Sequence, residues 1–188
     1  MSAESGLLSI KDKGIDYIQI NNFKDLIDAY EYLAVKDHGY ETIGMDSLTE
    51  IQQICMDAIL VENGREKPQI ADWGTLNTRM VTMVRKFRDL PCNFVVSCLV
   101  KTIEDESTMS TKLAPQLQGA IKDTVAAYFD EVFYLFAKAD KDGKVVHQML
   151  THGHDKIDFA KDRSGKLDKL EDVDFWHIHK KIFNENKE

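Results

Sequence analysis

Asp46 is the residue whose type and position most clearly indicate chemistry. It ends a short apolar segment, residues 41–46, and is followed at once by Ser47, where a helical pattern begins. Carboxylate oxygens are ligands that Mg²⁺ prefers, and Mg²⁺ keeps several of its own waters at such sites. In open α/β sheets, sites form at the carboxyl ends of the strands. The alternative is structural, because an acid just before a helix also occurs in ordinary N-cap regions.

Ser47 marks the start of the helix that must follow Asp46. Ser47 and Glu50 have the capping-box spacing S-L-T-E, in which each side chain hydrogen-bonds to the backbone of the other residue. Leu48 and Ile51 then continue at helical spacing. The sequence therefore places Asp46 at the junction between a strand and a helix.

The apolar periodicity predicts strands and helices that alternate along the chain. Strands are expected at residues 16–20, 41–46, 93–100 and 131–137, and helices at 22–35, 47–61, 73–90, 115–128 and from 172 onward. Polar loops are expected at residues 62–71 and 101–113, and residues 144–151 should pair back as a hairpin.

The order of these elements predicts one α/β domain over residues 1–188. Residues 93–100 are almost continuously apolar, which is typical of a strand buried on both faces of a parallel sheet. We therefore expect a mostly parallel central sheet with helices on both faces and antiparallel strands at one edge.

Composition narrows the class of protein. The net charge of −8 gives no general attraction to nucleic acid, so any such contact must come from a local basic patch or an oligomer. No apolar run approaches the roughly 20 residues that a membrane helix needs, and the N terminus does not resemble a signal peptide. Cys55, Cys92 and Cys98 lack a metal-binding spacing and indicate free thiols. We expect a cytoplasmic protein.

Six segments, taken in order, resemble the RecA-like ATPases, and most closely the RecA-type ATPases that phages encode for single-strand annealing and recombination. They are residues 3–6, 42–47, 77–90, 94–99, 118–135 and 162–165. Residues 42–47 (TIGMDS) resemble the Walker B strand, and residues 94–99 resemble the strand that carries a polar sensor. The resemblance implies a three-layer RecA-like P-loop fold that uses ATP and Mg²⁺.

The resemblance also implies roles for individual residues. Glu4 would be the catalytic base that activates water, and Asp46 would be a catalytic residue and the Mg²⁺ ligand. Asp46, Ser47, Ser97 and Arg163 would contact the nucleotide, with Arg163 reaching a neighbouring subunit as a charge-stabilising finger. The structural alternatives are a frayed terminal Glu4 and a solvated Arg163.

Both predicted polar loops occupy positions where RecA-like proteins contact single-stranded DNA. Arg65 and Lys67 in the first loop, and Lys101 and Lys112 in the second, are the candidates for phosphate contacts. Residues 104–106 are acidic and oppose this role for the second loop, for which a plain surface loop is the alternative.

One departure from the family pattern concerns the phosphate-binding loop. No G-x-x-x-x-G-K-[ST] segment occurs in residues 1–188, although that loop supplies backbone N–H groups and a Lys to the phosphates. In the family it precedes the position of Glu4 by one helix and one strand. We therefore expect the first strand and its helix to be absent and nucleotide binding to be defective. The sensor strand also departs, since it offers Ser97 and Cys98 where RecA has Gln.

The sequence thus predicts the core of an ATP-dependent DNA recombination or annealing protein of phage type, with single-stranded DNA and further copies of itself as partners. Two alternatives stay open. One is a non-catalytic RecA-like assembly module, and the other is a phage packaging or replication ATPase with the same core.

Overall fold

The computed structural model describes residues 1–4, 6–35, 37–105 and 110–183. The chain divides into two compact units. Unit 1 comprises Met1–Val100 and Pro115–Tyr128, and unit 2 comprises Lys101–Ala114 and Phe129–Glu188. Each unit is described by itself.

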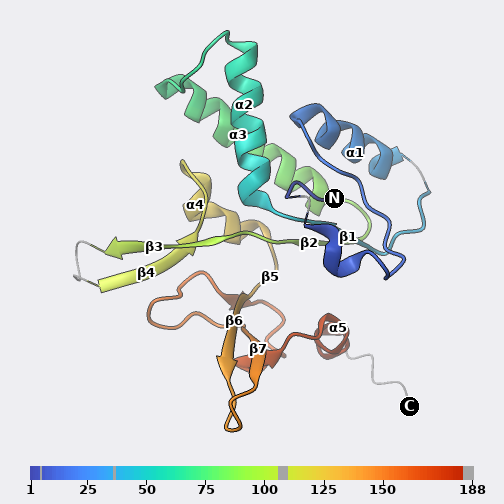
Figure 1. Ribbon diagram of the computed structural model, residues 1–188, viewed down its shortest axis with the longest axis vertical. Coiled ribbons are helices and arrows are strands. Elements are labelled where there is room, and N and C mark those ends of the chain that lie inside the picture. Colours follow the sequence, from blue (N-terminus) through green and yellow to red (C-terminus); the bar gives the residue numbers. More distant parts are fainter. Residues whose placement is uncertain (5, 36, 106–109, 184–188) are drawn as a thin grey trace. The chain divides into compact units, whose positions relative to one another are not determined.

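Unit 1 is built from helices and short parallel strands (Figure 1). Its elements are the 3-10 helix η1 (Leu7–Ile10), α1 (Phe23–Val35), β1 (Thr42–Met45), α2 (Leu48–Glu62), α3 (Ile70–Arg88), β2 (Asn93–Val96), α4 (Ile121–Thr124) and the 3-10 helix η2 (Val125–Tyr128). The predicted α1, β1, α2 and α3 are confirmed. Ser47 is the N-cap of α2, as its spacing to Glu50 predicts.

The strands of unit 1 run in parallel. β1 pairs with β2 in the register Ile43 to Phe94 and Met45 to Val96. On the other side of β1, Ser2 forms parallel bridges to both Asp46 and Gln19. Residues 1–3 therefore lie between β1 and the segment around Gln19. Residues 16–20 contribute a bridge at Gln19 and not the expected strand.

The core of unit 1 joins the helices to one face of this sheet. Phe87 of α3 stacks on Phe94 of β2 at 5.6 Å between ring centroids and meets Tyr30 of α1 edge-on at 5.5 Å. Burying a side chain of this size contributes about 1.5–3 kcal/mol. Cys55 of α2 is fully buried, and that burial raises the pKa of its thiol to about 12. Cys55 therefore acts as an apolar core residue, while Cys92 and Cys98 are partly buried.

The prediction of one strand over residues 93–100, buried on both faces, is wrong. β2 ends at Val96, and Val95 is 39% exposed. The strand ends because α2 captures the next backbone groups: the amide of Leu48 donates to the carbonyl of Ser97 at 2.8 Å, and the amide of Leu99 donates to the hydroxyl of Thr49 at 3.1 Å. The α/β class is confirmed, whereas the expected three-layer arrangement is not confirmed.

Unit 2 is mainly β-structure with antiparallel pairing. Its elements are β3 (Val100–Asp105), β4 (Ser110–Pro115), β5 (Glu131–Val132), β6 (Tyr134–Ala139), β7 (Val145–Leu150), β8 (Lys161–Asp162), β9 (Leu170–Asp172) and α5 (Phe175–Phe183), with Val100 and Pro115 at the border with unit 1. β6, β7 and β9 form one sheet, and β5 pairs with β8. The predicted hairpin of residues 144–151 and the C-terminal helix are confirmed.

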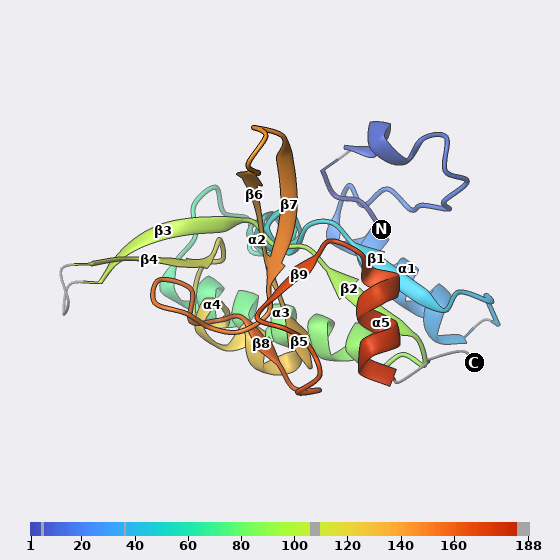
Figure 2. The same ribbon diagram turned by 90° about the horizontal axis from the view of Figure 1, so that it is seen from below.

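Three predictions for this half of the chain are wrong. Residues 101–113 are largely strand, in the two long strands of the β3–β4 pair (Figure 2), where a polar loop was expected. Pro115 ends β4 and does not open a helix, since the helical segment begins only at Ile121. The strand expected at 131–137 is split at Phe133 into β5 and β6, and each of these pairs antiparallel with a different strand. Side chains in such strands alternate between the protein and solvent, and Leu135 is 52% exposed.

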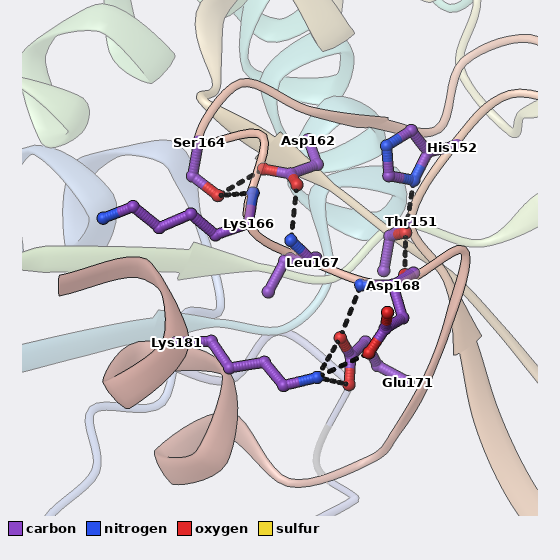
Figure 3. Close-up of polar contacts among 9 residues, drawn as sticks. All are labelled: Thr151, His152, Asp162, Ser164, Lys166, Leu167, Asp168, Glu171 and Lys181. Atoms are coloured by element: carbon purple, nitrogen blue, oxygen red, sulfur yellow. Dashed lines mark hydrogen bonds and ion pairs between the residues drawn. The ribbon is translucent and has the colours of Figure 1, made fainter. Parts of the chain in front are cut away.

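α5 is fixed to its unit by charge and by a small apolar cluster. The ammonium group of Lys181 donates to Asp168 at 2.9 Å and to both oxygens of the buried Glu171 at 2.8 and 3.0 Å (Figure 3). Ile178 packs with Met149 and Leu167 in a buried cluster. Within the described residues, no helix has both the length and the apolar character needed to cross a membrane.

Candidate functional site

Asp46 and Ser97 meet at the carboxyl edge of the parallel strands. Asp46 directly follows β1, and Ser97 directly follows β2. Because the two strands are parallel and in register, their ends bring both side chains to the same edge, and the Ser97 hydroxyl donates a hydrogen bond to Oδ1 of Asp46. The amide of Ser97 also donates to the carbonyl of Met45 at 3.0 Å. Asp46 is exposed, so its carboxylate is accessible from solvent.

Glu4 and Ser47 form the second half of this edge. The amide of Ala3 donates to the carbonyl of Asp46 at 2.7 Å, so Glu4 leaves the strand-like segment beside Asp46. The Ser47 hydroxyl donates to Oε1 of Glu4 and accepts from the Glu50 amide at 3.3 Å. The Ser47 hydroxyl therefore both caps α2 and holds the Glu4 side chain. The peptide bond between Asp46 and Ser47 is cis.

Four of the predicted site residues are thus brought together, namely Glu4, Asp46, Ser47 and Ser97. They present two carboxylates and two hydroxyls, all hard oxygen groups, as Mg²⁺ requires. Sites that bind Mg²⁺ through one or two carboxylates complete its coordination with waters and substrate phosphates. Within the described residues, no three His, Cys, Asp or Glu side chains are grouped so that they could hold a metal by themselves.

Sequence reasoning missed two residues of α2 that fix the surroundings of this edge. Thr49 accepts from the Leu99 amide and lies 3.5 Å from the sulfur of Cys98. The side-chain amide of Gln52 donates to the carbonyl of Gln118 at 3.0 Å and accepts from its amide at 2.7 Å. α2 therefore anchors both the segment after β2 and the segment before α4. The available signal was a polar residue, Gln52, at a core-facing position of an apolar helical stripe.

Arg163 belongs to unit 2, where it lies in the turn after β8. Its guanidinium group lies 3.1 Å from a carboxylate oxygen of Asp130, and its amide donates to the Asp130 carbonyl at 3.3 Å. The side chain of Arg163 is 55% exposed. Its role toward a nucleotide stays a prediction.

The residues predicted to contact DNA have different surroundings. Arg65 donates to both carboxylate oxygens of Asp72, at 2.7 and 2.8 Å, and so helps to hold the loop that precedes α3. Asp72 is buried, and its pKa is lowered first by the hydrogen bond from the Gln69 amide and then by Arg65. Lys67 is exposed in the same loop. The other two candidates, Lys101 and Lys112, are partly buried in β3 and β4.

Comparison with known families identifies a family for this chain. A family model described as an AAA domain matches residues 1–164. The chain therefore belongs to this family, which places it in the class of P-loop ATPases. That class indicates a nucleotide-binding role, and α5 lies outside the matched residues. No curated protein and no solved structure gives a significant match.

Proposed function

We propose that the edge formed by Glu4, Asp46, Ser47 and Ser97 is the metal-binding and water-activating part of an ATP site. The observation that carries this proposal is the hydrogen bond from Ser97 to Asp46 across the ends of two parallel strands. An acid that only capped α2 would have no reason to be held from the neighbouring strand. Ser47, not Asp46, performs the capping here.

Each residue has a role that follows from its contacts. Asp46 would hold Mg²⁺ through its exposed carboxylate, and Ser97 fixes the orientation of that carboxylate. Glu4 accepts a proton from the attacking water as a general base, and Ser47 keeps its carboxylate in place. Mg²⁺ held at this edge would supply positive charge against the phosphates of the nucleotide.

The phosphates need a cationic partner that this edge does not offer. Glu4 and Asp46 are both acids and repel the phosphates unless Mg²⁺ lies between them. Residues 1–188 include no phosphate-binding loop motif, and among the residues predicted to contact the nucleotide Arg163 carries a positive charge. Residues 1–188 should therefore bind nucleotide weakly on their own, because they contain no phosphate-binding loop motif.

Single-stranded DNA and further copies of the chain are the proposed partners. The support is the resemblance to RecA-type recombination ATPases, together with the exposed Lys67 beside the start of α3. With a net charge of −8, DNA binding must be local and depend on few phosphate contacts.

A non-catalytic assembly module is the second candidate function. It is favoured by the absence of a G-x-x-x-x-G-K-[ST] motif from residues 1–188. The two functions differ in one measurable property, which is the binding of Mg²⁺ and nucleotide at Asp46. A non-catalytic module does not need that binding.

Calorimetric titration of Mg²⁺-ATP tests the proposal. Residues 1–188 are compared with a chain extended at the N terminus by a strand, a phosphate-binding loop and a helix of the family type. We expect tight, Mg²⁺-dependent binding only for the extended chain, and Asp46→Asn should remove most of the Mg²⁺ dependence. Glu31→Gln, which alters an exposed acid on α1, is the matched control and should change nothing. Equal binding by Asp46→Asn and the parent chain would favour the assembly module.

A further inference from the structure

Two carboxylates face each other across the shortest strand pair of unit 2. β5 and β8 pair over only two residues each, with Glu131 directly opposite Asp162 and Val132 opposite Lys161. Directly opposed side chains in an antiparallel pair lie close together, and two like charges at such positions repel. This arrangement is therefore more stable when at least one of the two acids is uncharged.

Asp162 has the contacts of an ionised carboxylate. It accepts from the Ser164 hydroxyl at 2.5 Å and the Leu167 amide at 2.9 Å (Figure 3). It also accepts from the Gly165 amide at 3.1 Å, and the three bonds close the turn of residues 162–167. Burial alone would raise the pKa of Asp162, but the hydrogen bonds from Ser164, from the Leu167 amide and from Glu131 bring it down to about 2.

Glu131 has the contacts of a protonated carboxyl group. Its Oε1 accepts one bond, from the Ser164 amide at 3.2 Å, and its Oε2 is buried without any hydrogen-bond donor among the described residues. A buried acceptor without a donor is costly, whereas a proton on Glu131 turns that group into a donor to Asp162. Burial, followed by the charge of Asp162, raises the pKa of Glu131 to about 7.

We propose that Glu131 and Asp162 share one proton, with the Glu131 O–H group donating to Asp162, and that this proton keeps closed the turn that carries Arg163. When the proton passes to solvent water, both carboxylates are charged and oppose each other across the two-residue strand pair. The other charged groups around the pair are Asp130, Lys161 and Arg163. Asp130 is an acid and adds to the repulsion on Glu131, whereas Lys161 opposes it.

The consequence is a proton-dependent control of one turn near neutral pH. Opening β5–β8 removes the Glu131 contact to Ser164, so the turn and the position of Arg163 both loosen. Over one pH unit on each side of a midpoint near 7, the charged fraction of Glu131 changes from roughly a tenth to nine tenths. This inference does not depend on nucleotide binding, because all of the groups involved lie within unit 2.

Carbon-13 NMR of the Glu131 carboxyl group, followed with pH, tests the shared proton directly in the full 188-residue chain. The expected midpoint lies near 7, with Glu104→Gln as the control variant because Glu104 is an exposed acid of the same unit. Backbone amide exchange reports the turn. After correction for intrinsic rates, the protection of the Gly165 and Leu167 amides should fall about tenfold between pH 6 and pH 8.

The Glu131→Gln variant distinguishes the shared proton from other causes of pH-dependent amide protection in the turn. The Gln side chain is a permanent N–H donor to Asp162, so the protection of Gly165 and Leu167 should stay high and lose its pH dependence. Asp162→Asn should lower that protection at every pH, because the turn loses its anionic acceptor. A Glu131 midpoint near the ordinary value of 4.5, or wild-type protection that is the same at pH 6 and pH 8, would overturn the proposal.

Discussion

The hydroxyl of Ser97 donates a hydrogen bond to the carboxylate of Asp46, and the two residues come from the ends of neighbouring parallel strands. This contact links the acid that follows β1 to the polar residue that follows β2. It also fixes one oxygen of Asp46 from the side, and the carboxylate as a whole is exposed. A carboxylate that is oriented in this way suits an ion that demands near-ideal geometry.

Ser97→Ala should weaken Mg²⁺ binding at Asp46 while leaving the fold intact. A hydrogen bond to a charged group contributes about 1.5–3 kcal/mol, and exposure reduces this, so we expect a loss of about fivefold to tenfold in the apparent Mg²⁺ affinity of the nucleotide complex. Ser97→Thr keeps a hydroxyl and is the control. Titration of Mg²⁺ at fixed ATP with the loop-extended chain measures the effect. Equal affinities for all three chains would show that Ser97 does not support Asp46.

Gln52→Leu should destabilise unit 1. The substitution removes both hydrogen bonds to Gln118 and leaves a backbone N–H and a C=O group without partners, which costs about 2–3 kcal/mol. Gln53→Leu is the matched control, because Gln53 is exposed on the same helix and should change stability by less than about 0.5 kcal/mol. Urea unfolding followed by circular dichroism gives both values. If the two variants unfold alike, the Gln52 contacts do not hold the segment before α4.

Arg65 and Lys67 should differ in their effects on single-stranded DNA binding, although they share a loop. Lys67→Ala removes an exposed charge, so the slope of log K against log[salt] should become less negative by about 0.7, the value for one phosphate contact on a single strand. Arg65→Ala leaves the buried Asp72 without its ion pair and should act mainly through a lower unfolding temperature. Fluorescence anisotropy with a labelled oligonucleotide, at several salt concentrations, measures the slopes. An unchanged slope for Lys67→Ala would remove this loop from the DNA interface.

The stability of unit 2 should fall as the pH rises from about 4.5 to about 7. The pKa of Glu131 is raised from its ordinary value of 4.5 to about 7, so the folded unit holds this proton more tightly than the unfolded chain does. The stabilisation is therefore complete at low pH and is lost as the pH passes through the folded-state value. Solvent screening reduces the effect to about 1 kcal/mol, because the group is only partly buried. Thermal unfolding of wild type and Glu131→Gln at pH 5 and pH 8 measures it, and a parallel pH response of the two chains would contradict it.

Local signals in the sequence predict much of unit 1. The capping spacing from Ser47 to Glu50 locates the start of α2, and the apolar run ending at Asp46 locates β1. Because strands that are joined by helices run in parallel, their ends had to bring Asp46 and Ser97 to one edge.

The failures of sequence reasoning arise from contacts between distant residues. Nothing near Val96 indicates that α2 will capture the carbonyl of Ser97 and end β2 early. The pairing of Glu131 with Asp162 joins residues 31 positions apart through strands of two residues, and strands so short carry no periodic signal. The core-facing position of Gln52 could have marked it as unusual, but its partner is the backbone of Gln118, which has no sequence signature.

Paramagnetic NMR can test whether nucleotide-bound metal lies at the edge formed by Asp46 and Ser97. Mn²⁺ accepts the same oxygen ligands as Mg²⁺ and broadens the signals of nearby nuclei. Adding Mn²⁺-ATP to residues 1–188 at concentrations that populate a weak complex should selectively broaden the amides of Asp46, Ser97 and Glu4. Asp46→Asn should abolish that broadening, while Glu31→Gln should leave it unchanged. Broadening that persists in Asp46→Asn, or that spares these three amides, would contradict the account.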